Sequence, residues 1–158
     1  PYSPVLIDAT YAGLISGAAD APLVIPALNR DGDILSDLVL PLFGSIAGSE
    51  SLLVAFDDDY VPDALMAEAA HGTAPALEGK DIANPMAMIL AAAALLHYAG
   101  ELGHDGAHTA SRAVYESVLE ATATGVRTPD LGGHASTSEF TGEVIGRVRT
   151  KIDIWASL

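Results

Sequence analysis

The sequence predicts a single α/β domain that spans residues 1–158. Two observations carry this prediction. Short apolar runs of strand length alternate with helical segments in the first third of the chain, and three helices with clear start signals follow in the second half. We find no internal repeat or linker that would divide the chain.

The first elements are short. The apolar run Val5–Ile7 predicts a strand, residues 9–19 predict a helix of small residues, and Leu23–Ile25 predict a second strand. A further helix begins near Asp31, because acids favour a helix N-terminus, and it closes at Pro41 and Gly44. Its apolar positions recur at helical spacing: Ile34, Leu35, Leu38, Val39 and Leu42.

Ser51–Phe56 is an apolar run that predicts a strand, and residues 71–85 predict a long ordered loop, which is usually functional in a compact domain. Asn84 and Pro85 then predict a helix start, with Asn84 as cap and Pro85 at the first helical position, and the helix extends to about Gly100.

Two more helices complete the prediction. The first has its apolar face at Ala110, Val114, Val118 and Ala121 and ends at Gly125. The second begins at a capping box formed by Ser136 and Glu139. Its expected buried stripe consists of Phe140, Val144, Val148, Ile152 and Trp155.

Charge and composition exclude several function classes. Seven Lys and Arg against 21 Asp and Glu give a net charge of -14, which repels nucleic acid and anionic membranes. The absence of Cys excludes disulfides, Cys-ligated zinc, iron–sulfur centres and thiol catalysis, and it fits a cytoplasmic protein. The longest apolar run, Met86–Leu96, is too short to cross a bilayer.

The spacing of Asp33 and Asp37 leaves two interpretations open. Four positions apart on one helix, their carboxylates repel each other unless a cation lies between them, so they are candidate ligands of Mg²⁺ or Mn²⁺. Alternatively they are two solvated acids near a helix start. Asp8 follows an expected strand and is either a further ligand or a helix cap.

Other common site signatures are absent. No P-loop and no G-x-G-x-x-G motif occurs, and no G-x-S-x-G elbow is present. His71 beside Gly72 is a weak candidate for ligand binding. The spacing of His97, His104, His108 and His134 predicts no metal site.

Several segments together resemble the isocitrate and 3-isopropylmalate dehydrogenase family, the metal-dependent β-decarboxylating dehydrogenases. The order and approximate spacing of the segments agree with that family over nearly the whole chain. The matching residues are Asp8-Ala9, Asn29, Gly32–Asp37, His71–Pro75, Gly79-Lys80, Ile82–Pro85, Arg127–Gly133 and Ser136–Phe140.

The resemblance implies a three-layer α/β/α, non-Rossmann fold and an oxidative decarboxylation of a 2-hydroxy acid of the isocitrate, isopropylmalate or malate type. It implies that Mg²⁺ or Mn²⁺ is held by Asp33 and Asp37, with Asp8 completing the site from the partner subunit of a dimer. It further implies a nicotinamide cofactor at His71, Gly72, Thr73, Ala74, Pro75, Ala76, Asn84 and Asp130.

Departures from the family pattern bear on the cofactor. NADP-using members place Lys and Tyr where this chain has Ala76 and Leu77, so the resemblance implies NAD. Many NAD-using members have Asp at the position of Ala76, and Glu78 is a candidate substitute. Arg30 and His134 also differ from the family; Arg30 either pairs with the metal acids or substrate, or forms a surface salt bridge.

The chain looks like the C-terminal half of a family member about twice its size. The substrate-gripping arginines and the proton-transferring Tyr and Lys of the family belong to the N-terminal part, so the catalytic residues are expected outside this chain. The first hypothesis is a dehydrogenase part that works in a homodimer or with a complementary N-terminal polypeptide. The alternative is a stand-alone domain that binds metal and nucleotide without redox chemistry.

Overall fold

The computed structural model describes residues 4–17, 23–42 and 44–157, and these residues form two compact units, Pro1–Ser45 and Ile46–Leu158. The expectation of one domain over residues 1–158 therefore stays a prediction. Each unit is described by itself below. None of the described helices is long and apolar enough to cross a membrane.

The first unit contains two helices, α1 (Ile7–Ile15) and α2 (Asn29–Leu42), and the two contact each other. α2 includes the predicted helix and begins earlier than expected, so that Asp31 lies in its first turn. Pro41 lies in its last turn and has no N–H to donate to the preceding turn, and the helix ends one residue later, at Leu42. Leu35 is the buried residue of its apolar face.

The two strands predicted in this unit are wrong. Ile7 is the first residue of α1, and residues 23–28 have no regular structure. A strand needs a neighbour to accept its backbone hydrogen bonds, and no strand of the described residues pairs with these runs. The predicted helix over residues 9–19 is present as α1 up to Ile15, residues 16 and 17 form a turn, and residues 18 and 19 lie outside the described ranges.

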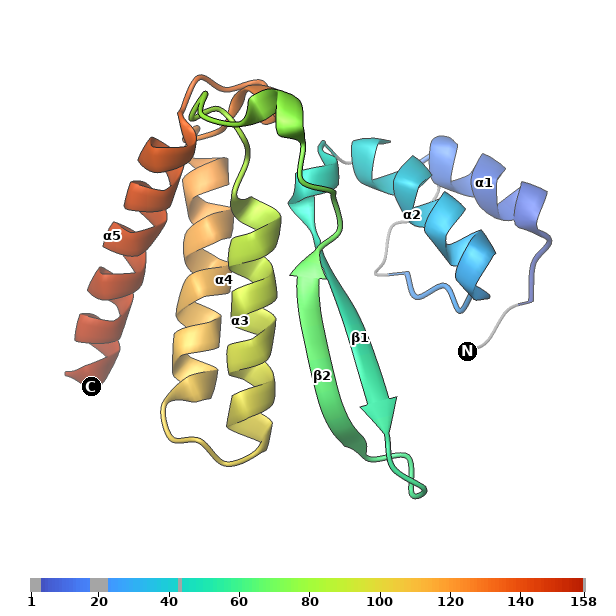
Figure 1. Cartoon of the computed structure of the whole chain (residues 1–158), viewed down its shortest axis with the longest axis horizontal. Helices are drawn as coiled ribbons and strands as arrows, with labels where there is room; N and C mark the ends of the chain where they lie inside the picture. Colours follow the sequence, from blue (N-terminus) through green and yellow to red (C-terminus); the bar gives the residue numbers. More distant parts are fainter. Residues whose placement is uncertain (1–3, 18–22, 43, 158) are drawn as a thin grey trace. The chain divides into compact units, whose positions relative to one another are not determined.

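The second unit has an antiparallel hairpin beside three helices (Figure 1). The hairpin consists of β1 (Glu50–Phe56) and β2 (Pro62–Ala69), and the helices are α3 (Met86–Glu101), α4 (Ala107–Ala123) and α5 (Thr137–Ala156). Three short 3-10 turns connect them, at Ile46–Gly48, Pro75–Leu77 and Pro129–Leu131. α3 packs against the hairpin and α4, and α4 packs against α5.

β1 confirms the strand predicted at Ser51–Phe56, whereas β2 was not predicted. Most residues of β2 are Pro, Ala, Leu, Met and Glu, which have low or moderate strand propensity. The pairing across the hairpin decides the structure instead: Leu53 lies opposite Met66, and Val54 opposite Leu65. The mixture of helix and strand agrees with the predicted α/β class.

The core of this unit lies between α3, α4 and α5. Its buried cluster consists of Met86, Leu90, Val118, Ala121, Phe140 and Val144. Phe140 is completely buried, and Val148 is packed against the cluster. The predicted stripe of α5 is therefore confirmed at its N-terminal end, but Ile152 is 39% exposed and Trp155 is half-buried.

Local start signals were predicted well. Ser136 Oγ accepts a hydrogen bond from the Glu139 amide, and the Glu139 carboxylate accepts one from the Ser136 amide, so the capping box is confirmed. Asn84 Oδ1 accepts from the Met86 amide at 3.0 Å, so its side chain binds the first amide of α3 as expected, although Asn84 lies one residue before the N-cap. Pro85 itself lies just before the helix rather than at its first position.

Candidate functional site

The candidate cofactor loop occupies residues 71–85, as predicted, and it contains only one 3-10 turn. Ala74 has a φ of 44°, a left-handed conformation that is uncommon for a residue with a Cβ. Gly72, Thr73, Pro75 and Ala76 are exposed. Residues 72–76 are therefore open to solvent, and the 3-10 turn at Pro75–Leu77 gives this part of the loop a defined backbone conformation.

His71 is half-buried at the end of β2. Its Nδ1 lies 2.9 Å from the Gly72 carbonyl oxygen, which fixes the ring against its own backbone when Nδ1 carries the proton. In that tautomer Nε2 is available as an acceptor.

One hydrogen bond of Asn84 connects this loop to the loop at residues 126–136, which lies beside it at the N-terminal ends of α3 and α5 (Figure 1). Asn84 Nδ2 donates to Asp130 Oδ2 at 2.9 Å, while Asn84 Oδ1 caps α3. The second oxygen of Asp130 accepts from Thr128 Oγ at 2.5 Å. Two residues expected at the cofactor, Asn84 and Asp130, are thus brought together by the fold.

A second set of contacts joins the first loop to the first turn of α5, and the sequence did not predict it. Thr137 donates from its amide to the Asp81 carbonyl and from its hydroxyl to the Ala83 carbonyl. The Ser138 hydroxyl and amide both donate to Asp81 Oδ1, at 2.8 and 3.0 Å. The Ser138 hydroxyl is the main reason that the pKa of Asp81 lies below its ordinary value.

Gly133 is required by the close folding of the second loop. A Cβ at this position would lie 2.0 Å from the Arg127 carbonyl oxygen, so no side chain fits. The Gly133 amide donates to the Thr128 carbonyl, and the Ala135 amide to that of Arg127. The same loop carries Asp130, which accepts a hydrogen bond from Asn84.

The three candidate metal ligands lie in the first unit. Asp33 and Asp37 are one turn apart on α2, as predicted, and both are exposed. Asp8 lies in the first turn of α1 rather than at its cap, and its Oδ1 accepts from the Ala9 amide at 2.8 Å. The single chain does not gather the three acids into one ligand group; within the described residues, such a group forms elsewhere.

Arg30 forms an ion pair with a neighbouring acid. Its guanidinium pairs with Asp31 at 3.2 Å, and the side chain is 86% exposed. Within the described residues it is therefore a surface salt bridge, which contributes little stability.

Two histidines and one glutamate that the sequence analysis did not connect lie close together in the structure. His97 and Glu101 of α3 and His108 of α4 have ligating atoms that all lie within 4.8 Å of one another. The spacing of His97 and Glu101, four positions apart on a helix, was a readable signal for one half of this group. His108 could not be assigned to it before the turn between α3 and α4 was known.

Comparison with known proteins covers most of the chain. The family profile described as isocitrate/isopropylmalate dehydrogenase matches residues 2–144. The chain is 41% identical over 127 residues to an isocitrate/homoisocitrate dehydrogenase of Thermus thermophilus. The aligned segment covers 80% of this chain and 34% of that protein. It is 34% identical over 153 residues to 3-isopropylmalate dehydrogenase B of Aspergillus niger, which covers 92% of this chain and 37% of that protein.

A solved structure agrees with these matches. The apo β-decarboxylating dehydrogenase of Thermococcus kodakarensis superposes with a TM-score of 0.70 at 33% identity, over 92% of this chain and 40% of that one. The chain thus spans a little over a third of the length of these relatives, less than the expected half. The shared fold confirms the predicted fold class. On the family profile, the sequence identity and the shared fold together, the chain belongs to the isocitrate/isopropylmalate dehydrogenase family.

Proposed function

We propose that this chain is part of an NAD-dependent, Mg²⁺- or Mn²⁺-dependent oxidative decarboxylase of a 2-hydroxy acid. The observation that carries the proposal is the exposed pair Asp33 and Asp37 on α2, within a chain of a decarboxylating dehydrogenase family. The relatives are named for isocitrate, homoisocitrate and 3-isopropylmalate, which are all 2-hydroxy acids with further carboxylates. We therefore assign the substrate to that chemical class.

The donor set of α2 fits a hard divalent ion. Two carboxylates one turn apart repel each other in solvent, and a bound cation would remove that repulsion. Oxygen ligands and an open, solvated setting suit Mg²⁺ and Mn²⁺. When bound, such an ion supplies a Lewis acid that polarises the substrate oxygens.

Two acids of one helix leave further coordination positions of such an ion open. We assign the third to Asp8 of a second copy of the chain, so the proposed site is shared across a homodimer. Asp8 is exposed in the first turn of α1, where a partner can reach it. Its hydrogen bond to the Ala9 amide uses one carboxylate oxygen and leaves the other for the ion.

We place the cofactor at the paired loops of the second unit. The exposed backbone of residues 72–76 offers a surface for the adenosine part, and Asn84 and Asp130 hold the two loops together. The N-terminus of α3 begins directly after this loop, and a helix N-terminus favours anions such as a pyrophosphate. Ala76 and Leu77 provide no cation for a 2′-phosphate, which favours NAD over NADP.

The proton-transferring and substrate-gripping groups are proposed to lie outside this chain. Positioning and acid–base catalysis together supply many powers of ten in rate. We therefore expect this chain by itself to bind Mn²⁺ and NAD but not to oxidise isocitrate, 3-isopropylmalate or malate.

Calorimetric titration with Mn²⁺ tests the metal assignment. Asp33→Asn and Asp37→Asn should each weaken Mn²⁺ binding by about tenfold or more, because each removes a charged oxygen ligand. Asp58→Asn is the matched control: an exposed acid in the turn of the hairpin, which should bind as the unmodified chain does. Equal Mn²⁺ affinity in all four proteins would remove the metal assignment.

The cofactor assignment is tested by titration with NAD and NADP. The chain should prefer NAD, and Glu78→Ala should weaken NAD binding several-fold, whereas Glu68→Ala on β2, also exposed, should not. Unaltered NAD affinity in the Glu78 variant would exclude that residue. Equal affinity for the two nucleotides would overturn the assignment of NAD.

Complementation separates the two functional classes. The chain is mixed with the part of the Thermus thermophilus relative that it does not match, and NAD reduction is followed. Appearance of turnover supports the dehydrogenase. Binding of Mn²⁺ and NAD without turnover in the assembled mixture favours the alternative, a binding domain without redox chemistry.

A further inference from the structure

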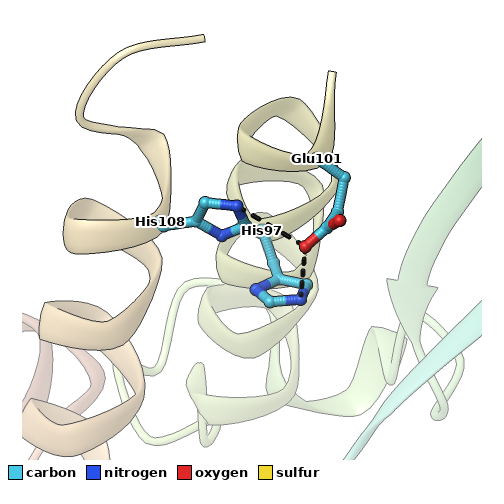
Figure 2. A group of neighbouring side chains, drawn as sticks. All are labelled: His97, Glu101 and His108. Carbon is cyan, nitrogen blue, oxygen red and sulfur yellow. Dashed lines mark ion pairs between the residues drawn. The ribbon is translucent and has the colours of Figure 1, made fainter. Parts of the chain in front are cut away.

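We propose that His97, Glu101 and His108 form a second metal site, one that binds a late first-row divalent ion such as Zn²⁺. The imidazoles of His97, on α3, and His108, on α4, both point toward one carboxylate oxygen of Glu101 (Figure 2). Glu101 Oε1 lies 3.7 Å from His97 Nε2 and 3.5 Å from His108 Nε2. The two imidazole rings have their centroids 4.9 Å apart and meet edge to face at 68°.

The local structure explains why these side chains meet. His97 and Glu101 lie four positions apart on α3, so they project from the same face of that helix. His108 lies in the first turn of α4, directly after the turn at residues 102–106. Backbone hydrogen bonds from Leu102, Gly103 and His104 to α3 carbonyls hold this turn in one shape.

Gly100 provides room for the ring of His108. A Cβ at this position would lie 2.6 to 2.7 Å from three atoms of the His108 ring, so the ring would have to move away. Glycine is unfavourable inside a helix, and this one is not needed for a positive φ. Its missing side chain lets the imidazole lie against α3, next to the Glu101 carboxylate.

The scaffold beneath the group is rigid. Ser111, one turn beyond His108, is buried, and its hydroxyl donates to the Ala93 carbonyl at 2.8 Å. Ala93 and Ala113 are completely buried, which is consistent with close packing of α3 against α4. A site built on two packed helices keeps its ligands in place better than a site on mobile loops.

The geometry and the donor atoms select the ion. In a tetrahedral zinc site, ligands at about 2.0–2.1 Å from the metal lie roughly 3.3 Å from each other. The nitrogen–oxygen separations exceed this by only a few tenths of an ångström, and all three ligand atoms lie within 4.8 Å of one another. Rotation of the exposed side chains would bring them to ligand spacing. Imidazole nitrogens suit Zn²⁺, Cu²⁺ and Ni²⁺, while Mg²⁺ prefers oxygen, so this site selects a different class of ion from the carboxylates of α2.

All three side chains are more than half exposed, so the site opens to solvent. Two histidines and one glutamate supply three ligands, and the fourth position of a tetrahedral ion remains for water or a ligand atom of another molecule. The bound ion would also link α3 to α4 beside the turn that joins them.

Calorimetric titration with ZnCl₂ tests the site. The titration is run in a neutral, non-chelating buffer with excess Mg²⁺, which occupies carboxylate sites but competes poorly for imidazole. The chain should bind one Zn²⁺. His97→Gln, Glu101→Gln and His108→Gln should each weaken binding at least tenfold, whereas the control His104→Gln, an exposed histidine in the turn itself, should leave it unchanged.

Two further measurements test whether the ion binds at this site and within one chain. Gly100→Ala should weaken Zn²⁺ binding several-fold while helical content by circular dichroism is kept, because the added methyl group displaces the His108 ring. Light scattering should show the same mass with and without Zn²⁺. The proposal is overturned if the His97 and His108 variants bind Zn²⁺ as the unmodified chain does, or if Zn²⁺ doubles the mass by bridging two chains.

Discussion

Asn84 and Asp130, which are 46 positions apart in the sequence, are joined by a hydrogen bond of 2.9 Å between Asn84 Nδ2 and Asp130 Oδ2. The same Asn84 side chain caps α3 through its other atom. A single buried amide therefore sets both the start of a helix and the spacing of the two loops at which we place the cofactor.

Asn84→Ala should destabilise the chain by about 2 kcal/mol, since it removes a helix cap and leaves Asp130 without one of its donors. Asn84→Asp keeps an acceptor for the Met86 amide but places a second carboxylate beside Asp130. The variant should therefore be less stable at neutral pH, and this destabilisation should be smaller at acidic pH, where a carboxylate is protonated. Urea denaturation at two pH values measures both effects. Equal stability of all three proteins at neutral pH would show that this hydrogen bond is unimportant.

Phe140→Ala should cost about 3–5 kcal/mol, because the ring is completely buried between the three helices and its loss leaves a cavity. Phe56→Ala, at a position 57% exposed, is the matched control and should cost far less. Guanidinium denaturation followed by circular dichroism compares the two. A similar loss in both variants would contradict the assignment of the core to α3, α4 and α5.

The pKa of Asp81 should lie below its ordinary value of 3.8, because the Ser138 hydroxyl donates to the charged carboxylate. Since the folded-state pKa is the lower one, this contact stabilises the chain fully above about pH 4 and is lost as the pH falls through the folded-state value. Ser138→Ala should raise the pKa of Asp81 toward 3.8 in a carboxyl NMR titration. Ser157→Ala, near the C-terminus of α5, serves as control, and an unchanged Asp81 in Ser138→Ala would contradict the prediction.

The pKa of Tyr115 should lie well above its ordinary value of 10.0, first because burial disfavours the phenolate and second because its hydroxyl donates to Glu50 at 2.5 Å. Because the folded-state pKa is the higher one, the protonated Tyr115 stabilises the chain fully below about pH 10. This stabilisation is lost as the pH rises through the folded-state pKa. Tyr115→Phe should cost about 1–2 kcal/mol at neutral pH. Phenolate absorbance is recorded against pH for the unmodified chain and for the variant, and the difference between the two curves reports Tyr115 alone. No ionisation of Tyr115 should be seen near its ordinary pKa of 10.0.

Local signals in the sequence predicted α3, α4 and α5. The Ser136–Glu139 capping box, the Asn84 cap and the glycine after α4 act within one turn of the chain, so they can be read without knowing the fold. The positions of Asp33 and Asp37 on one helix were predictable for the same reason.

Tertiary contacts decided the rest. Leu23–Ile25 has the composition of a strand but lacks a partner in the described part, while Ala64–Ala69, with many helix formers, is a strand because β1 pairs with it. His97 and His108 meet because the turn at residues 102–106 returns the chain against Gly100. A sequence determines periodicity and caps, which depend on neighbours along the chain, whereas strand pairing and the meeting of side chains depend on what the fold brings alongside them.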